Sequence, residues 1–221
     1  MNLIKFLYLT FLLFNLSSCN NKKEEKSFSK VTKTIKLDTI IDSDLKKIKV
    51  RSDLKNFNTI YKELSLINVY YLGYDSLVHR GQLVCHKSVV NELKEIFIEL
   101  YKIKFPIESV RPISLFEWND EISMSSNNTS CFNYRTVSNS NKLSEHSKGL
   151  AIDLNPKYNP YISSKGVISP KNGEYNNKNI GTIIVDSKVI SIFRDKGWKW
   201  GGNWKRSNGF FIFRCIRWER P

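Results

Sequence analysis

The stretch that decides the fold is Ser144-Glu-His-Ser-Lys-Gly149-Leu-Ala-Ile-Asp-Leu-Asn-Pro156. It sets His146 and Asp153 seven residues apart, with Gly149 between them. Residues 150–154 have the character of a short strand that ends at the Asn-Pro pair. Because side chains alternate along a strand, Ala151 and Asp153 share one face and the three aliphatic residues share the other.

The two faces of this strand predict different roles. The aliphatic face can pack on a core while Asp153 points into a cleft. Gly149 lets the chain turn, so that His146 returns over the same cleft. An imidazole and a carboxylate are ligand types that zinc takes in proteins. We therefore predict a metal site with His146 and Asp153 as ligands.

The full pattern Ser-x-His-x-x-Gly-x-Ala-x-Asp is far more specific than a histidine and an aspartate alone. Further segments accompany it in family order, at residues 81–84, 104–107, 125–135, 159–161 and 197–204. Together they resemble the zinc D-alanyl-D-alanine carboxypeptidases of the vancomycin-resistance type and the phage endolysins that cut L-alanyl-D-glutamate bonds. The resemblance implies one zinc ion and a peptidoglycan stem peptide as substrate.

The resemblance also implies roles for three residues around the cleft. In the family, the arginine at the position of Arg135 contacts the substrate's carbonyl or carboxylate, and a guanidinium fork suits either group. The alternative is a structural arginine that ties down its loop. Ser144 either bonds the substrate or shapes the turn before His146. Trp200 either binds substrate beside the cleft or packs in the core.

The C-terminal part of the family pattern is missing. A hydrolytic zinc needs three protein ligands, an open position for water and a base. In the family, the third ligand and the base come from Asp-x-x-His-Phe, shortly after Trp-Gly-Gly-x-Trp. Gly209 stands here at the position of the base and Ile212 at that of the histidine. For the remaining histidines, His79 and His86, ordinary structural roles are favoured over metal binding. His146 and Asp153 alone should hold zinc weakly.

Two explanations for this break stay open. Either the protein is a degenerate family member that no longer hydrolyses, or the reading frame has slipped. Codons for Asn-Gly can contain ATG-GA, which begins Met-Asp one frame over. Codons for Phe-Ile-Phe-Arg can contain CAT-TTT-CAG, which reads His-Phe-Gln in the remaining frame. The tail 214–221, with Cys215, fits a shifted frame. Unambiguous in-frame codons through Pro221 would remove the second explanation.

The N-terminus predicts secretion and lipid anchoring. Residues 1–18 carry Lys5 and then an apolar run too short to span a bilayer comfortably, which is typical of a signal peptide. Leu16-Ser-Ser-Cys19 resembles a lipobox, in which Cys19 is lipidated; the alternative is an ordinary signal peptide with a chance cysteine. The polar, Lys-rich residues 19–51 predict a flexible lipid-anchored tether, and residues 52–221 the peptidase-like domain.

Charge indicates which partners to expect, and the cysteines raise the question of a disulfide. The 221-residue chain has a net charge of +14, spread over tether and domain, which favours anionic envelope polymers over nucleic acid as the partner. We expect a monomer in the bacterial cell envelope, anchored to the membrane and facing the periplasm or the exterior. Cys85 and Cys131 could pair, but packing is the first interpretation of both.

The expected fold is α+β, with a small antiparallel sheet that bears the zinc cleft and packs with two or three helices. The expected elements are a weak helix at 53–65, a strand at 66–72, a hairpin of 76–79 with 82–85 around Arg80-Gly81, a helix from Ser88 to about Phe105-Pro106, a strand at 110–116, a polar loop at 119–141, a second loop at 157–181 and a helix at 185–196.

Two function hypotheses follow. The first is a lipid-anchored zinc peptidase of peptidoglycan stem peptides, of the D,D-carboxypeptidase or the L-Ala-D-Glu endopeptidase type. The second is a catalytically dead envelope lipoprotein that keeps the cleft and binds peptidoglycan or a partner protein. The missing third ligand and base favour the second hypothesis for the sequence as it stands.

Overall fold

The computed structural model describes residues 39–49, 51, 57–136, 141–162, 166–201 and 212–215. The chain divides into two units, residues 1–39 and 40–221, and every described strand and helix belongs to the second unit. The predicted lipidation site, Cys19, lies outside the described residues. No helix among the described residues is both long and apolar enough to cross a membrane.

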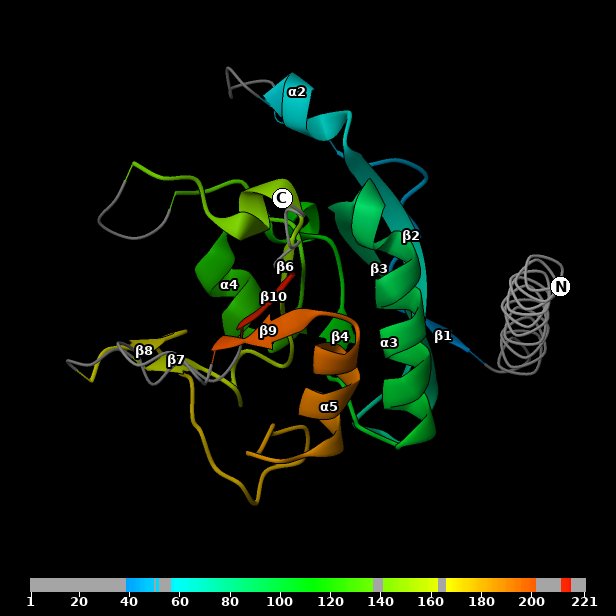
Figure 1. Ribbon diagram of the computed structural model, residues 1–221, viewed down its shortest axis with the longest axis vertical. Helices are drawn as coiled ribbons and strands as arrows, with labels where there is room; N and C mark the ends of the chain where they lie inside the picture. Colours follow the sequence, from blue (N-terminus) through cyan, green and yellow to red (C-terminus); the bar gives the residue numbers. More distant parts are fainter. Residues whose placement is uncertain are drawn as a thin grey trace, which may run out of the picture. The chain divides into compact units, whose positions relative to one another are not determined.

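The second unit has the α+β fold that the sequence predicts (Figure 1). Its long antiparallel strands β2 (Leu64–Leu72) and β3 (Val78–His86) form a sheet with the short parallel strand β1 (Ile40–Ile41), in the order β1-β3-β2. A second sheet has the order β6-β10-β9 and is antiparallel throughout. Its strands are β6 (Ala151–Asp153), β9 (Trp198–Trp200) and β10 (Ile212–Cys215).

Short elements complete the unit. Two further pairs are β4 (Ser109–Val110) with β5 (Asn128–Thr129), and β7 (Tyr161–Ile162) with β8 (Ile168–Ser169). The described α-helices are α2 (Phe57–Tyr61), α3 (Val90–Lys102), α4 (Asp120–Ser125) and α5 (Lys188–Asp195). The 3-10 turns are Lys87–Val89, Ile113–Phe116 and Glu145–Lys148.

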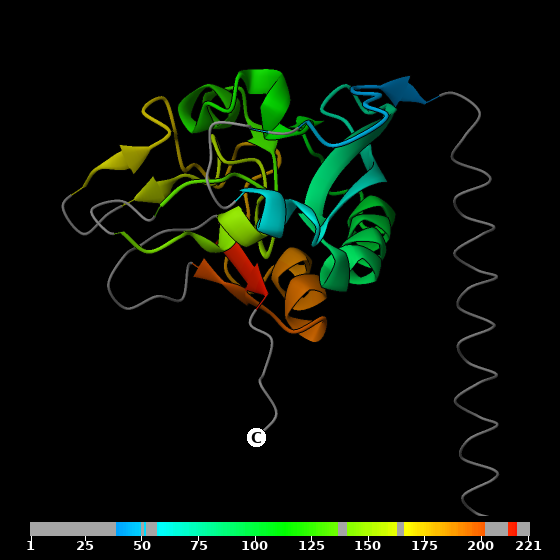
Figure 2. The same ribbon diagram turned by 90° about the horizontal axis from the view of Figure 1, so that it is seen from above.

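One hydrophobic core connects the helices to both sheets. Helix α3 buries Leu93, Ile96, Phe97 and Leu100 along one stripe, as its apolar spacing predicts, and packs on β2. Helix α5 packs on β9 and α3 (Figure 2). Ile152 of β6 and the following Leu154 are fully buried in the same core. The aliphatic face predicted for residues 150–154 therefore does face the core.

The predicted hairpin around Arg80-Gly81 is wrong, because β3 runs without interruption from Val78 to His86. The turn that joins β2 to β3 lies at residues 73–77 instead, where Gly73 N–H donates to Leu77 O at 2.8 Å. A Cβ at position 81 would lie 2.3 Å from Val110 O. The glycine therefore marks a close approach of β4 to the face of β3, which local sequence does not distinguish from a turn.

The segment 110–141 is also more ordered than predicted. The expected strand at 110–116 is limited to Ser109–Val110, and a 3-10 turn follows it. The expected polar loop contains helix α4, which Asn119 caps by accepting a hydrogen bond from Ile122 N at 3.0 Å. It also contains β5, so the segment leads to the site through short elements.

Residues 40–48, which we call the strap, lie in the predicted tether but pack on the first sheet. Asp42 N–H donates to Arg80 O at 3.1 Å. The Gln82 amide accepts from Leu45 N at 2.7 Å and donates to Leu45 O at 3.1 Å, as a neighbouring strand would. Ile48 is buried. The folded unit therefore begins at Ile40, ahead of the boundary expected at residue 52.

A network around His79 fixes the strap. The His79 ring lies 2.8 Å from Asp42 through Nδ1 and 3.1 Å from Asp75 through Nε2. Tyr71, which stacks on His79 with 5.4 Å between ring centroids, donates its hydroxyl to the other Asp42 oxygen. Burial by itself lowers the pKa of His79, but the hydrogen bonds and charges of the two aspartates outweigh it, so the pKa is raised.

The raised pKa predicts a pH-dependent contribution to stability. A histidine whose pKa is higher in the folded state stabilises it fully below its unfolded pKa of about 6.5, and the contribution is lost as pH rises through the folded pKa. We expect His79→Gln to lower the free energy of unfolding more at about pH 5 than at about pH 9, measured by urea denaturation. His86→Gln is the matched control and should show no such difference, since that ring contacts Ser88. An equal loss at both pH values would contradict the prediction.

Candidate metal centre and substrate cleft

The turn that carries His146 is shaped by the residues on either side of it. Ser144 Oγ accepts a hydrogen bond from His146 N at 3.3 Å and so caps the 3-10 turn Glu145–Lys148. Gly149 ends the turn with φ of 69°, and its N–H donates to His146 O at 3.0 Å. Of the two roles left open for Ser144, the structure shows the turn-forming one.

Gly149 also docks this turn on the end of β3. Its carbonyl accepts a hydrogen bond from His86 N at 3.0 Å. A Cβ at this position would lie 2.6 Å from that nitrogen and 2.9 Å from the carbonyl carbon of Cys85. The Cys131 thiol contacts the same carbonyl oxygen at 3.3 Å. The glycine is therefore needed both for its backbone conformation and for the lack of a side chain.

The strand that carries Asp153, β6, is held by the backbone of Ser130. Asp153 and Ser130 exchange two backbone hydrogen bonds, of 2.9 and 3.2 Å. Neither Asp153 nor Ala151 is exposed, and Ile152 between them faces the core. This alternation directs Asp153 away from the core face, as the sequence predicts.

His146 and Asp153 do converge. His146 Nε2 lies 3.4 Å from Asp153 Oδ1, and the two residues are only 3% and 2% exposed. His146 Nδ1 lies 2.9 Å from Cys131 O. A carbonyl oxygen only accepts, so Nδ1 carries a proton, and in the neutral ring Nε2 presents a lone pair towards Oδ1. Neither Nε2 nor Oδ1 has a hydrogen-bond partner among the described residues.

Two buried, unpartnered acceptors that face each other are the arrangement expected around a cation. Imidazole nitrogen and carboxylate oxygen both suit zinc, and the bond from Nδ1 to a backbone carbonyl orients the ring as in many metal sites. Yet no third histidine, cysteine or acidic side chain joins the pair among the described residues. The two donors fit zinc in kind, but the set is one ligand short of a catalytic site.

The other two histidines do not supply that ligand. The sequence holds three histidines, and His79 lies between Asp42 and Asp75 in the strap network. The His86 ring contacts the Ser88 hydroxyl at 2.7 Å and accepts from Ser88 N at 3.2 Å. Both side chains therefore have the ordinary structural roles that the sequence favours.

Strand β10 bears directly on the missing ligand. Its backbone register pairs Ile212 with Asp153 and Phe213 with both Ile152 and Trp200. Residues directly opposite each other in an antiparallel pair are near neighbours. The backbone position of Ile212 is therefore next to Asp153, a predicted metal ligand, where the family pattern has a histidine. Gly209, at the position of the base, lies outside the described residues.

Arg135 is tied to the histidine turn and to α4. The Ser147 hydroxyl accepts from Arg135 N at 2.8 Å and donates to Arg135 O at 2.6 Å. The Arg135 guanidinium lies 2.9 Å from Asp120 Oδ2 through Nε, and Asn133 Nδ2 donates to the other Asp120 oxygen at 2.7 Å. The arginine side chain is still 30% exposed. Its loop is fixed as the structural alternative requires, while part of the side chain remains exposed.

The other residues singled out by the sequence lie in the core. Trp200 is 5% exposed and Trp198 2%, while Lys199 between them is exposed, so both indoles share the predicted face. That face is packed, which is the core alternative for Trp200. Cys85 and Cys131 are buried and not joined by a disulfide, and burial raises the pKa of the Cys85 thiol to about 12.

The sequence did not predict the roles of four groups around the site: Asp120, Asn133, Ser147 and the Cys131 carbonyl. Ser147 stands inside the quoted stretch, but nothing in its spacing predicts a contact with Arg135. Asp120 is separated from Arg135 by 14 residues and becomes its partner only because α4 forms within the expected loop. A carbonyl contact carries no sequence signal at all, since every residue has one.

Comparison with known proteins supports the family resemblance for one segment of the chain. The family model described as D-alanyl-D-alanine carboxypeptidase matches residues 138–209. That segment contains His146, Asp153 and Trp200 and amounts to about a third of the chain. Neither the curated proteins nor the solved structures gave a match. The predicted resemblance to the zinc D-alanyl-D-alanine carboxypeptidase family is confirmed over the part of the chain that carries the buried histidine–aspartate pair.

Proposed function

We propose that this protein is a peptidase of peptidoglycan stem peptides whose centre is the His146–Asp153 pair. The observation that carries the proposal is the unpartnered, buried contact between His146 Nε2 and Asp153 Oδ1. The family match over the same residues supports a peptidase-type role. Zinc held by these side chains would supply a Lewis acid for an amide carbonyl and would lower the pKa of a bound water.

In this proposal some of the chain's residues orient His146 and another, Arg135, binds the substrate. The Cys131 carbonyl fixes the His146 ring, and Ser144 and Gly149 fix its turn. Arg135 is held through its backbone by Ser147 and through Nε by Asp120, and its partly exposed side chain would bind the substrate's carboxylate or carbonyl. A D,D-carboxypeptidase and an L-Ala-D-Glu endopeptidase would both use this contact.

A second function is favoured by the register of β10. Because Ile212 pairs with Asp153, an aliphatic residue occupies the backbone position of the third ligand. A protein with this sequence would keep a cleft that binds peptidoglycan or a partner protein without cutting it. The two functions share the binding step and differ in hydrolysis.

The proposed location rests on the N-terminal sequence. We propose that Cys19 carries a lipid and that residues after it span the distance to the folded unit, which begins at Ile40. The chain would then act as a monomer in the bacterial envelope, outside the cytoplasm. The membrane and the stem peptide would be its partners, with no role for nucleic acid.

Zinc titration of the purified protein tests the pair directly. A four-ligand zinc site is worth roughly 10–16 kcal/mol, so two ligands, at about half of that, should give a Kd between about one and two hundred micromolar. We expect His146→Ala and Asp153→Asn each to abolish this binding, measured by calorimetry. His86→Ala is the control that should leave it unchanged.

Incubation with purified muropeptides and excess zinc, followed by chromatography, then separates the two functions. Slow cleavage lost in Asp153→Asn supports the peptidase, whereas binding without cleavage supports the second function. Nanomolar zinc affinity would show a third ligand outside the described residues. Binding unaffected by both substitutions would show that zinc binds elsewhere.

A further inference from the structure

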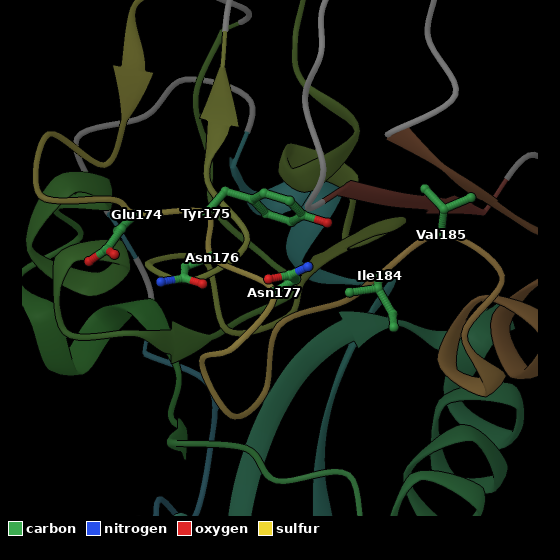
Figure 3. A pocket seen from close by; sticks show the side chains of 6 residues that line it. All are labelled: Glu174, Tyr175, Asn176, Asn177, Ile184 and Val185. Atoms are coloured by element: carbon green, nitrogen blue, oxygen red, sulfur yellow. The ribbon is translucent and has the colours of Figure 1, made fainter.

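A cavity of about 570 Å³ lies in the loop between β8 and α5. It is lined by Glu174, Tyr175, Asn176, Asn177, Ile184 and Val185 (Figure 3). The Tyr175 ring lies in the middle of this group, with Glu174 and Asn176 on one side and the two aliphatic residues on the other (Figure 3). The cavity therefore has a polar end and an apolar end.

Hydrogen bonds within the loop hold two of the lining residues, Tyr175 and Asn176. The Tyr175 hydroxyl donates to Ile183 O at 3.1 Å, and Ile183 is fully buried in the core. Thr182 Oγ1 donates to Asn176 O at 3.0 Å, which closes the loop on itself. The Asn176 side-chain oxygen accepts from Lys178 N at 3.0 Å. Tyr175 and Asn176 are thus held in place before any ligand binds.

The charge of the cavity is opposite to that of the protein. Among the described residues that line it, Glu174 alone carries a carboxylate and none is basic, although the chain has a net charge of +14. At the other end, Ile184 is 46% exposed and Val185 59%. A carboxylate and amide oxygens opposite an exposed aliphatic wall suit a primary ammonium on an aliphatic chain.

The cavity is also close to the His146–Asp153 pair along the chain. Glu174 N–H donates to Lys157 O at 2.8 Å, and Lys157 follows Asp153 by four residues. Even a fully extended chain of that length spans only about 14 Å between the two Cα atoms. A peptide of a few residues bound at the pair can therefore place a long side chain in the cavity.

We infer that this cavity is a subsite for the side-chain ammonium of a diamino-acid residue in the substrate, with Glu174 as its counter-charge. This inference rests on the proposed action on stem peptides and specifies which residue of such a peptide is recognised. Ile184 and Val185 contact the methylene chain, and Glu174 with the neighbouring amides binds the ammonium. Glu174 is a specificity-determining residue in this arrangement and takes no part in hydrolysis.

Binding of two synthetic stem peptides to the purified full chain tests the subsite. One peptide carries a lysine with a free side-chain amine, and the other carries the same lysine acetylated. An exposed charge pair is worth up to about 1 kcal/mol, so we expect acetylation to weaken binding about three- to fivefold. Glu174→Gln should weaken binding of the free-amine peptide by the same factor and leave the acetylated peptide unchanged.

Glu99→Gln, which changes an exposed acid on α3, is the matched control and should retain the full difference between the peptides. Equal binding of both peptides to the unsubstituted protein would overturn the subsite and leave the proposed function standing. An equal preference for the free amine in Glu174→Gln would also overturn it. Failure of both peptides to bind at all would instead overturn the proposed function, on which the subsite rests.

Discussion

The double substitution Gly209→Asp/Ile212→His is expected to turn a weak zinc site into a tight one and to produce a peptidase. Position 212 is paired with Asp153 in the second sheet, so a histidine there lies next to a predicted ligand. Roughly 10–16 kcal/mol for four zinc ligands suggests about 3–4 kcal/mol for one more. Zinc affinity should therefore rise by about two to three orders of magnitude.

The two single substitutions separate ligand from base. Ile212→His alone should give most of the gain in zinc affinity with little hydrolysis, because a missing general base costs about 10²- to 10⁴-fold in rate. Gly209→Asp alone should change neither property much, and Ile212→Gln controls for the new polar side chain. Zinc calorimetry and release of D-alanine or of a new amino terminus from muropeptides are the measurements. If the double variant binds zinc no better than the unsubstituted protein, the predicted correspondence of Ile212 to the family's histidine is wrong.

This experiment also bears on the reading frame. The Met-Asp and His-Phe-Gln readings lie in two different frames, so two single-base errors near the 3′ end would be needed to replace both missing residues. The repaired protein would then resemble the true gene product. Sequencing the gene through the codon for Pro221 decides this independently of any protein chemistry. Unchanged codons together with a successful repair would mean that the protein has lost its ligand by substitution.

Local patterns predicted the centre of the fold well, because there the local and the tertiary preferences agree. The stretch 144–156 predicted both the turn and β6, and the convergence of His146 with Asp153 followed from alternation and one glycine. The apolar stripe of α3 likewise marks its buried face. In each case the residues that form the element also carry the signal.

The failures occur where a distant segment decides the structure. Gly81 has the composition of a turn, but its partner is Val110 on β4. The polar strap has the composition of a tether, yet Asp42 meets His79 and Leu45 meets Gln82 on β3. Arg135 acquires Asp120 only through α4. Contacts between segments so far apart in the sequence leave no periodic signal in either one.

Gly149→Ala is expected to be among the most destabilising single substitutions in the described part of the chain. With φ of 69°, an alanine costs about 1–2 kcal/mol in the left-handed region. Its Cβ would also lie 2.6 Å from His86 N and 2.9 Å from the Cys85 carbonyl carbon. Both atoms belong to the backbone of β3 and cannot rotate away, so relieving the overlap adds about 1–3 kcal/mol. The total of roughly 2–5 kcal/mol is a large part of a typical domain's stability.

Gly197→Ala isolates the backbone-conformational part of this effect, so its difference from Gly149→Ala gives the steric part. Gly197 has φ of 83°, but a Cβ there meets nothing within 4 Å. Urea denaturation should therefore give a loss of only about 1–2 kcal/mol for Gly197→Ala, against the larger loss for Gly149→Ala. The Gly149 carbonyl accepts a hydrogen bond from His86 N. A backbone displacement that relieves the overlap at position 149 should therefore also move the His146 turn, so zinc binding should weaken in Gly149→Ala and not in Gly197→Ala. Equal losses in the two variants would mean that β3 yields easily, and that Gly149 is required only for its backbone conformation.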